Sequence, residues 1–179
     1  MDHSPTTDQE PPGPLDFLEF ATACAGHLQK TAYLLTGGDL HLAEDLVQEA
    51  LSRMFVRWRK VSRVENPVGY AHTVLVNTFL SLRRRRSSTE RVTFEFPEIA
   101  VTDADPALRL TLLRALQGLS ARDRAVLVLR FWEDRSVEET AAVLRLSATA
   151  VRSRSHRALN RIRDLLGDGF VERTRAEPR

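Results

Sequence analysis

Arginines are the residues whose type and spacing most clearly indicate a chemistry in this sequence. Arg83, Arg84, Arg85 and Arg86 form an unbroken basic run, and residues 145–163 contain six arginines without a single acid. A guanidinium is planar and always charged, so it binds phosphate oxygens and pairs with both acceptors of a guanine edge. The formal net charge of the whole chain is only +2. The excess of positive charge is therefore local, in these two separate segments. These segments predict two contacts with a polyanion such as nucleic acid.

The residues that usually carry catalysis or bind metals show no such concentration. The histidines are scattered without metal-ligand spacing, at His3, His27, His41, His72 and His156. The single cysteine, Cys24, has no partner for a disulfide or a metal cluster, and its place on a helical apolar stripe predicts a small buried residue. The sequence contains no glycine-rich phosphate loop and no nucleophile elbow. We therefore expect no enzymatic activity, no metal site and no cofactor.

Length and composition favour a globular cytoplasmic protein. The 179 residues suffice for one ordinary domain or two small ones, and 42% of them are hydrophobic. No apolar run approaches the roughly 18 residues that a membrane span needs. The N-terminus lacks the basic stretch and following apolar run of a secretory signal. We expect a cytoplasmic location and no membrane span.

Apolar residues recur with helical spacing, which predicts an all-α fold of two small helical domains joined by a flexible linker. Residues 15–86 predict a three-helix bundle with breaks at Gly37-Gly38 and Asn66-Pro67. Within its second helix, which is expected to run from an N-cap at Asp39 to about Lys60, Phe55 and Trp58 are expected in the core. Residues 107–167 predict the second domain. The remaining segments predict a disordered tail (1–14), an extended acidic linker (87–106) and a polar tail (168–179).

Residues 136–166 have the layout of a helix-turn-helix. Ser136 with Glu139 three residues later matches a capping box, and a turn at 145–147 separates a short helix from a long one. In such a motif the second helix enters the major groove and offers polar residues near its N-terminus to base edges. An ordinary helical hairpin with a solvated basic face is the alternative, and six arginines without a compensating acid argue against it. The polar residues in question are Thr149, Arg152, Ser153, Arg154, His156 and Arg157.

Three ordered segments, together covering about residues 15–166, resemble the extracytoplasmic-function (ECF) group of RNA polymerase sigma factors. Domain four of that family, which recognises the upstream promoter element, is similar to LSARDRAVLVLRFWEDRSVEETAAVLRLSATAVRSRSHRALNRIR. The polymerase-binding part of domain two resembles HLAEDLVQEALSRMFVRWRKV, and its downstream-element reader resembles NPVGYAHTVLVNTFLSLRRRR. The segment AYLLTGGDLHLAEDLVQEAL is similar to SigE-type members. The short linker and the missing intermediate domain also match this group.

The resemblance implies roles for individual residues. Asp45, Gln48 and Glu49, on one side of the second helix, would bind a coiled-coil segment of the largest polymerase subunit. Without the resemblance, a solvated surface with a pair such as Glu49–Arg53 explains them equally well. The residues implied for the downstream, −10 element are Asn66, Tyr70, Asn77, Arg83, Arg84, Arg85 and Arg86. Those implied for the upstream, −35 element are Thr149, Arg152, Ser153, Arg154, His156 and Arg157. Ser81 departs from the family, which commonly has an acid four residues after the asparagine that Asn77 matches.

The partners implied by the resemblance are core RNA polymerase, promoter DNA and an anti-sigma factor. The main alternative is a dimeric helix-turn-helix regulator that acts without polymerase and binds a palindromic duplex alone. A third hypothesis, a scaffold for protein interactions, leaves both basic clusters unexplained.

Overall fold

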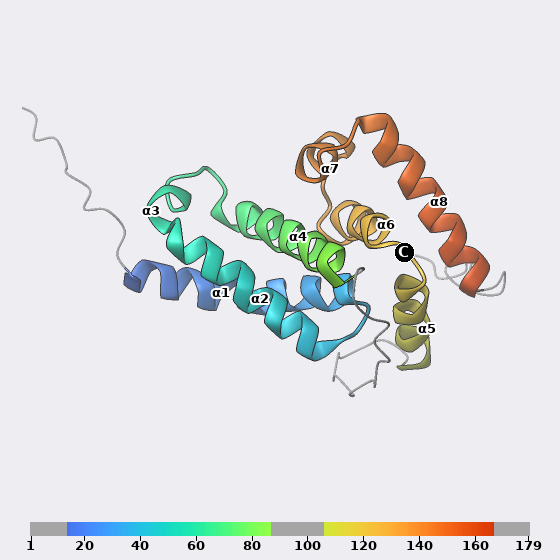
Figure 1. The fold of residues 1–179 in the computed structure, drawn as a ribbon, viewed down its shortest axis with the longest axis horizontal. Coiled ribbons are helices and arrows are strands. Elements are labelled where there is room, and N and C mark those ends of the chain that lie inside the picture. The colour runs from blue at the N-terminus through green and yellow to red at the C-terminus, as the bar shows by residue number, and fades with distance from the viewer. Residues whose placement is uncertain (1–13, 87–105, 167–179) are drawn as a thin grey trace, which may run out of the picture.

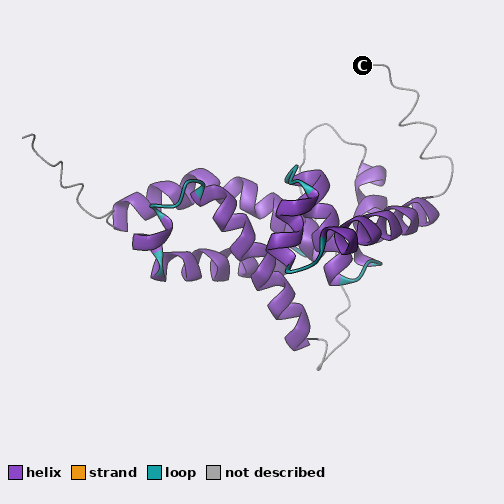
Figure 2. Cartoon of the chain, turned by 90° about the horizontal axis from the view of Figure 1, so that it is seen from above, coloured by secondary structure: helices purple, strands orange, loops and turns teal. Residues whose placement is uncertain are grey.

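The computed structural model describes residues 14–86 and 106–166, and every regular element in these ranges is a helix (Figures 1 and 2). The all-α prediction is therefore confirmed for the described residues. The tail at 1–13, the segment at 87–105 and the tail at 167–179 lie outside them, so the predictions made there stay untested. No described helix has both the length and the apolar character needed to cross a bilayer. The elements are α1 (Pro14–Thr36), α2 (Leu40–Val56), α3 (Trp58–Val61), α4 (Pro67–Arg86), α5 (Pro106–Gln117), α6 (Ala121–Leu127), the π-helix η1 (Val128–Trp132), α7 (Val137–Leu144) and α8 (Ala148–Leu166).

Helices α1, α2 and α4 form the first bundle, with the short α3 at one end of it (Figure 1). Two glycines end α1 because both adopt positive φ, +74° at Gly37 and +97° at Gly38, which side chains rarely tolerate. Asp39 then caps α2, its Oδ1 accepting a hydrogen bond of 2.9 Å from the Leu42 amide. Cys24 is buried, as predicted from its stripe.

The second helix ends earlier than predicted, because Arg57 leaves the helical conformation (φ −111°, ψ 10°) and α3 restarts at Trp58. Trp58 is buried as expected, but the prediction of a core position for Phe55 is wrong, since Phe55 is 52% exposed. Phe55 lies beside the buried stripe that passes through Met54, and its ring contacts Phe17 with the centroids 5.2 Å apart. Phe55 therefore lies at the edge of the core, one helical position away from the buried Met54.

Helices α5 to α8 form the second bundle, which contains the predicted helix-turn-helix. The capping box is confirmed: Ser136 Oγ accepts from the Glu139 amide at 3.0 Å, and Glu139 Oε2 accepts from the Ser136 amide at 2.7 Å. Arg145 ends α7 in the left-handed region (φ 52°) and begins the turn into α8. Val151 and Ala158 bury one side of α8 against the bundle.

The two bundles pack directly against each other, and one buried cluster continues from the first into the second. Ala125, Val126, Val128 and Leu129, on α6 and η1, join the core residues of α1, α2 and α4. Figure 1 shows α6 beside α4, and η1 also contacts α1. In η1 the Glu133 amide donates to the Val128 carbonyl at 3.0 Å, a wider turn than that of an α-helix.

Candidate nucleic-acid interface

The exposed face of α8 brings together five of the six residues proposed for the upstream element. Their spacing of three and four residues places them on one side of the helix, opposite the buried Val151 and Ala158. Arg152 Nη2 lies 3.1 Å from Glu138 Oε1, but both side chains are more than 60% exposed. Such an exposed pair is worth little energy, so this guanidinium can exchange its partner for a nucleic acid. The five residues are Thr149, Arg152, Ser153, His156 and Arg157.

Arg154, the sixth residue, lies apart from that face. Its Nη1 donates a 2.7 Å hydrogen bond to Asp123 Oδ1, and each of the two side chains is only 26% exposed. Asp123 belongs to α6, so this ion pair holds α8 against its own bundle. The position of Arg154 therefore suits orienting α8 better than contacting a base.

The first bundle presents its candidate residues along α4. Asn77, Arg84 and Arg85 are exposed, while Tyr70 and Arg83 are half-buried. The side chain of Arg86 lies outside the described part. Asn66 has a structural task as well, because its Oδ1 accepts a 2.7 Å hydrogen bond from the Gly69 amide at the start of α4.

A groove of about 550 Å³ separates α4 from the second bundle and is strongly cationic. Asn77, Arg83 and Arg84 line one wall, whereas Arg122 and Arg145 belong to the second bundle. Arg53 also faces the groove, and none of the described residues that line it is acidic. This concentration of like charge favours an anionic ligand.

The exposed surface of α2 carries Asp45, Gln48 and Glu49, so the structure leaves all three accessible. Glu49 Oε1 accepts a 2.8 Å hydrogen bond from Arg53 Nε, which is the intrahelical pair that the sequence suggested. Arg53 Nη1 also donates to Thr78 Oγ1 of α4 at 3.2 Å. The three polar residues thus form an acidic surface beside a basic one.

Comparisons with known proteins match both bundles to one family. Sigma-70 region 2 matches residues 20–89, and sigma-70 region 4 matches residues 115–164. The chain is 37% identical over 154 residues to the RNA polymerase sigma-E factor of Streptomyces coelicolor, covering 85% of this chain and 86% of that one. It is 40% identical over 126 residues to the sigma-E factor of Streptomyces antibioticus, covering 69% and 70%. This chain belongs to the ECF RNA polymerase sigma factors.

A solved structure agrees with this assignment. The sigma factor RpoE of Bartonella quintana, crystallised in complex with the anti-sigma factor NepR, is similar to this sigma factor with a TM-score of 0.69 and 28% identity. The match covers 84% of this chain and 96% of that one. As a member of the family, the sigma factor serves promoter-directed transcription initiation with RNA polymerase and has no enzymatic activity of its own, which confirms both predictions.

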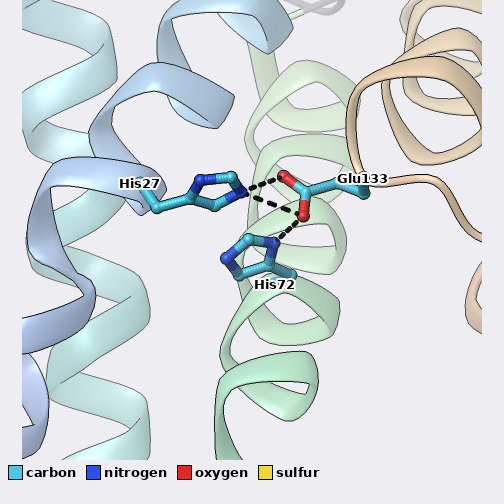
Figure 3. Close-up of side chains that lie close together, drawn as sticks. All are labelled: His27, His72 and Glu133. Carbon is cyan, nitrogen blue, oxygen red and sulfur yellow. Dashed lines mark hydrogen bonds and ion pairs between the residues drawn. The ribbon is translucent and has the colours of Figure 1, made fainter.

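One polar cluster in the sigma factor was not foreseen from the sequence. His27 of α1 and His72 of α4 both point toward Glu133, which follows η1 (Figure 3). His27 Nε2 lies 3.3 Å from each carboxylate oxygen, His72 Nδ1 is hydrogen-bonded to Oε2, and Thr31 Oγ1 donates to Oε1 at 2.5 Å. Glu133 stands 106 residues from His27 and 61 from His72, so no local spacing announces the cluster.

The carboxylate of Glu133 is buried yet ionised. Burial by itself would raise the pKa of the Glu133 carboxyl. Hydrogen bonds from His72 and Thr31, the charge of His72 and the contact with His27 outweigh that effect and hold the pKa below its ordinary value. The sigma factor therefore places a buried negative charge at the contact between its two bundles.

Proposed function

We propose that this sigma factor acts in the cytoplasm, binding core RNA polymerase through α2 and two promoter elements through α4 and α8. The observation that carries the proposal is the pairing of two separate arginine-rich helical surfaces with one exposed acidic surface on the same chain. A single basic surface would suit an ordinary duplex-binding protein. Two basic surfaces and an acidic one suit a protein that must contact DNA twice and a protein partner once.

The polymerase contact is assigned to Asp45, Gln48 and Glu49. These side chains are exposed on one helix, and carboxylates and an amide give directional, charge-assisted hydrogen bonds to a basic helical partner. The Glu49–Arg53 pair is 48% and 42% exposed, so exchanging it for a partner's arginine or lysine costs little.

The DNA contacts are divided between the bundles. On the exposed face of α8, Arg152 in the second turn and Arg157 at mid-helix are suited to base edges of the upstream element in the major groove. On α4, Asn77 and the arginines from Arg83 onward are suited to the downstream element, where one strand must be held open along a basic track. We assign Arg154 to holding α8 in place, because its guanidinium is engaged by Asp123.

Promoter binding requires the two bundles to separate. Asn77 and Arg84 face a groove whose opposite wall is formed by Arg122 and Arg145 of the second bundle. DNA that reaches Asn77 must displace that wall, so the closed arrangement is a resting state that opens on the polymerase.

We also propose that an anti-sigma protein stabilises this closed arrangement. The similar sigma factor from Bartonella quintana was crystallised with such a protein. Both bundles expose apolar side chains to solvent, including Val56 (83% exposed) and Phe131 (60% exposed). An inhibitor that covers these side chains would gain the free energy of burying them.

The test is transcription in vitro from a genomic fragment library with the purified chain and purified core polymerase. We expect RNA 5′ ends that depend on the chain and that share two upstream sequence elements at a constant separation. The dimeric-regulator alternative predicts something different: specific binding of a palindromic duplex by the chain alone, and no start sites that depend on it. That second result would overturn the proposal.

A further inference from the structure

We propose that His27, His72 and Glu133 form a Zn²⁺-binding site that joins the two bundles and holds the sigma factor in its closed arrangement. Two imidazoles and one carboxylate are a ligand set that zinc accepts, with a fourth position open to water. The three residues come from three different segments, α1, α4 and the end of η1, and they meet only in the folded chain (Figure 3).

The spacing of the donor atoms fits a single ion. One nitrogen from each histidine and one oxygen of Glu133 all lie within 4.8 Å of one another. Tetrahedral zinc with bonds of about 2.0–2.2 Å sets its ligand atoms roughly 3.3 Å apart. His27 Nε2 already lies 3.3 Å from both carboxylate oxygens. To admit the ion, the hydrogen-bonded pair of His72 and Glu133 must separate, and the most widely spaced donor atoms of the cluster, which lie up to 4.8 Å apart, must move closer together.

The charge balance of the cluster favours a cation. The Glu133 side chain is only 7% exposed, and within the described ranges no lysine or arginine makes an ion pair with it. Arg135 is the nearest candidate by sequence, but its Nη2 donates to the Gly69 carbonyl at 2.7 Å and its Nη1 lies 3.4 Å from Thr73 Oγ1. A buried carboxylate whose described side-chain partners are two imidazoles and a hydroxyl is a group that a divalent ion can stabilise.

Surrounding groups orient the carboxylate and leave a route to solvent. Thr31 Oγ1 donates to Glu133 Oε1 and accepts a 3.1 Å hydrogen bond from Trp132 Nε1, the kind of outer contact that fixes a metal ligand. A cavity of about 760 Å³ borders the cluster, and His27 is half exposed at its edge. Glu65, Asp134 and Glu139 also line this cavity, against one arginine, Arg135, so acidic side chains predominate along the entry path.

Zinc at this position would bind the closed chain in preference to the open one. Two ligands belong to the first bundle and one to the second, so separating the bundles destroys the site. An ion that binds one state only shifts the population toward that state. Since promoter binding requires opening, zinc would lower transcription, and this consequence rests on the proposed function.

The site is tested by titrating Zn²⁺ into the full, untagged chain after its metals have been removed, in competition with a chromophoric chelator. We expect one ion per chain, and binding at least ten-fold weaker in His27→Ala and Glu133→Gln. His27 is half exposed and Gln has the shape of Glu, so both variants are expected to fold, which circular dichroism checks. His41→Ala is the matched control, because His41 is exposed on α2 and is not one of the three residues of the cluster. Its affinity should equal that of the unaltered chain.

No stoichiometric binding, or equal binding by all four proteins, overturns the site. A fluorescence-transfer pair on α3 and α8 then measures closure: zinc should raise the transfer in the unaltered chain and leave Glu133→Gln unchanged. Zinc that binds without changing the transfer overturns the coupling to closure. If the chain starts specific transcripts but binds no zinc, only the zinc site is overturned. If it binds zinc but never starts transcription, the proposed function is overturned.

Discussion

Arg124 Nη1 donates a 2.9 Å hydrogen bond to the main-chain carbonyl of Leu35, joining the second bundle to the end of α1. Its Nη2 donates to the carbonyls of Gln117 and Leu119, at 3.1 and 3.3 Å. The Arg124 residue is only 2% exposed, and burial, together with the charge of Arg83, lowers its pKa to about 10. It still carries its charge at neutral pH. The carbonyl ends of α1 and α5 stabilise that charge through their negative helix termini.

Replacing Arg124 by Met should destabilise the chain by about 3 kcal/mol, because three carbonyls lose a charged donor. The measurement is the free energy of unfolding in urea. Arg122→Met is the control, since Arg122 is exposed on the same helix and should change stability by no more than about 0.5 kcal/mol. Equal effects of the two substitutions would show that the buried contact contributes nothing.

Gly37→Ala should weaken the same contact from the other side. A Cβ at Gly37 would lie 2.6 Å from Gln117 Cγ and 3.1 Å from Arg124 Nη1, and φ there is +74°. Strain of the backbone alone costs roughly 1–2 kcal/mol, and the close contacts add to it. Gly26→Ala is the matched control, because Gly26 lies within α1 with nothing near its Cβ position. Alanine there should raise the melting temperature slightly, whereas a fall as large as that of Gly37→Ala would contradict the account.

Arg152→Ala and Arg157→Ala should each reduce affinity for promoter DNA by 1–3 kcal/mol per lost base contact, about 5- to 150-fold, and relax specificity at one base pair. The measurement is holoenzyme binding to a panel of single-base promoter variants. Arg163→Ala is the comparison, because Arg163 is exposed much further along α8. Its loss should weaken all sequences alike, as expected for a phosphate contact. If all three substitutions lowered the affinity for every promoter variant equally, the assignment of α8 to base recognition would be contradicted.

The capping box at the start of α7 should make the free energy of unfolding depend on pH in the acidic range. The Ser136 amide and hydroxyl, aided by the charge of Arg135 and opposed slightly by burial, hold the pKa of Glu139 below its ordinary 4.5. A carboxyl with a lowered folded pKa stabilises fully above pH 4.5 and loses this effect as the pH falls through the folded value. The stability difference between the unaltered chain and Glu139→Gln should therefore shrink between pH 6 and about pH 3. A difference that does not change with pH would contradict this assignment.

Local signals in the sequence predicted much of the fold. Gly37, Asp39 and the Ser136–Glu139 box act within four residues, so their hydrogen bonds follow from sequence spacing alone. Phe55 shows the limit of that reasoning, because one helical position decides between the core and its edge. The break at Arg57 has no glycine or proline to announce it.

Within the candidate site, only the residues that share one face of a single helix could be predicted from the sequence. The face of α8 follows from a repeat of three and four residues, but the ion pair of Arg154 with Asp123 depends on how α8 packs on α6. The contacts of Arg124 with Leu35 and of Glu133 with His72 span 89 and 61 residues. Such pairs depend on the docking of two bundles, which the spacing of residues along the chain does not encode.

The most direct test of the central claim is the affinity of the fluorescently labelled chain for core RNA polymerase, measured by anisotropy without DNA. We expect tight, saturable binding that is unchanged in the double variant Arg152→Ala/Arg157→Ala and at least ten-fold weaker in Asp45→Ala/Glu49→Ala. Glu19→Ala, an exposed acid on α1, should bind normally. Failure of the unaltered chain to bind, or equal weakening by both double variants, would contradict the assignment of α2 to the polymerase and α8 to DNA.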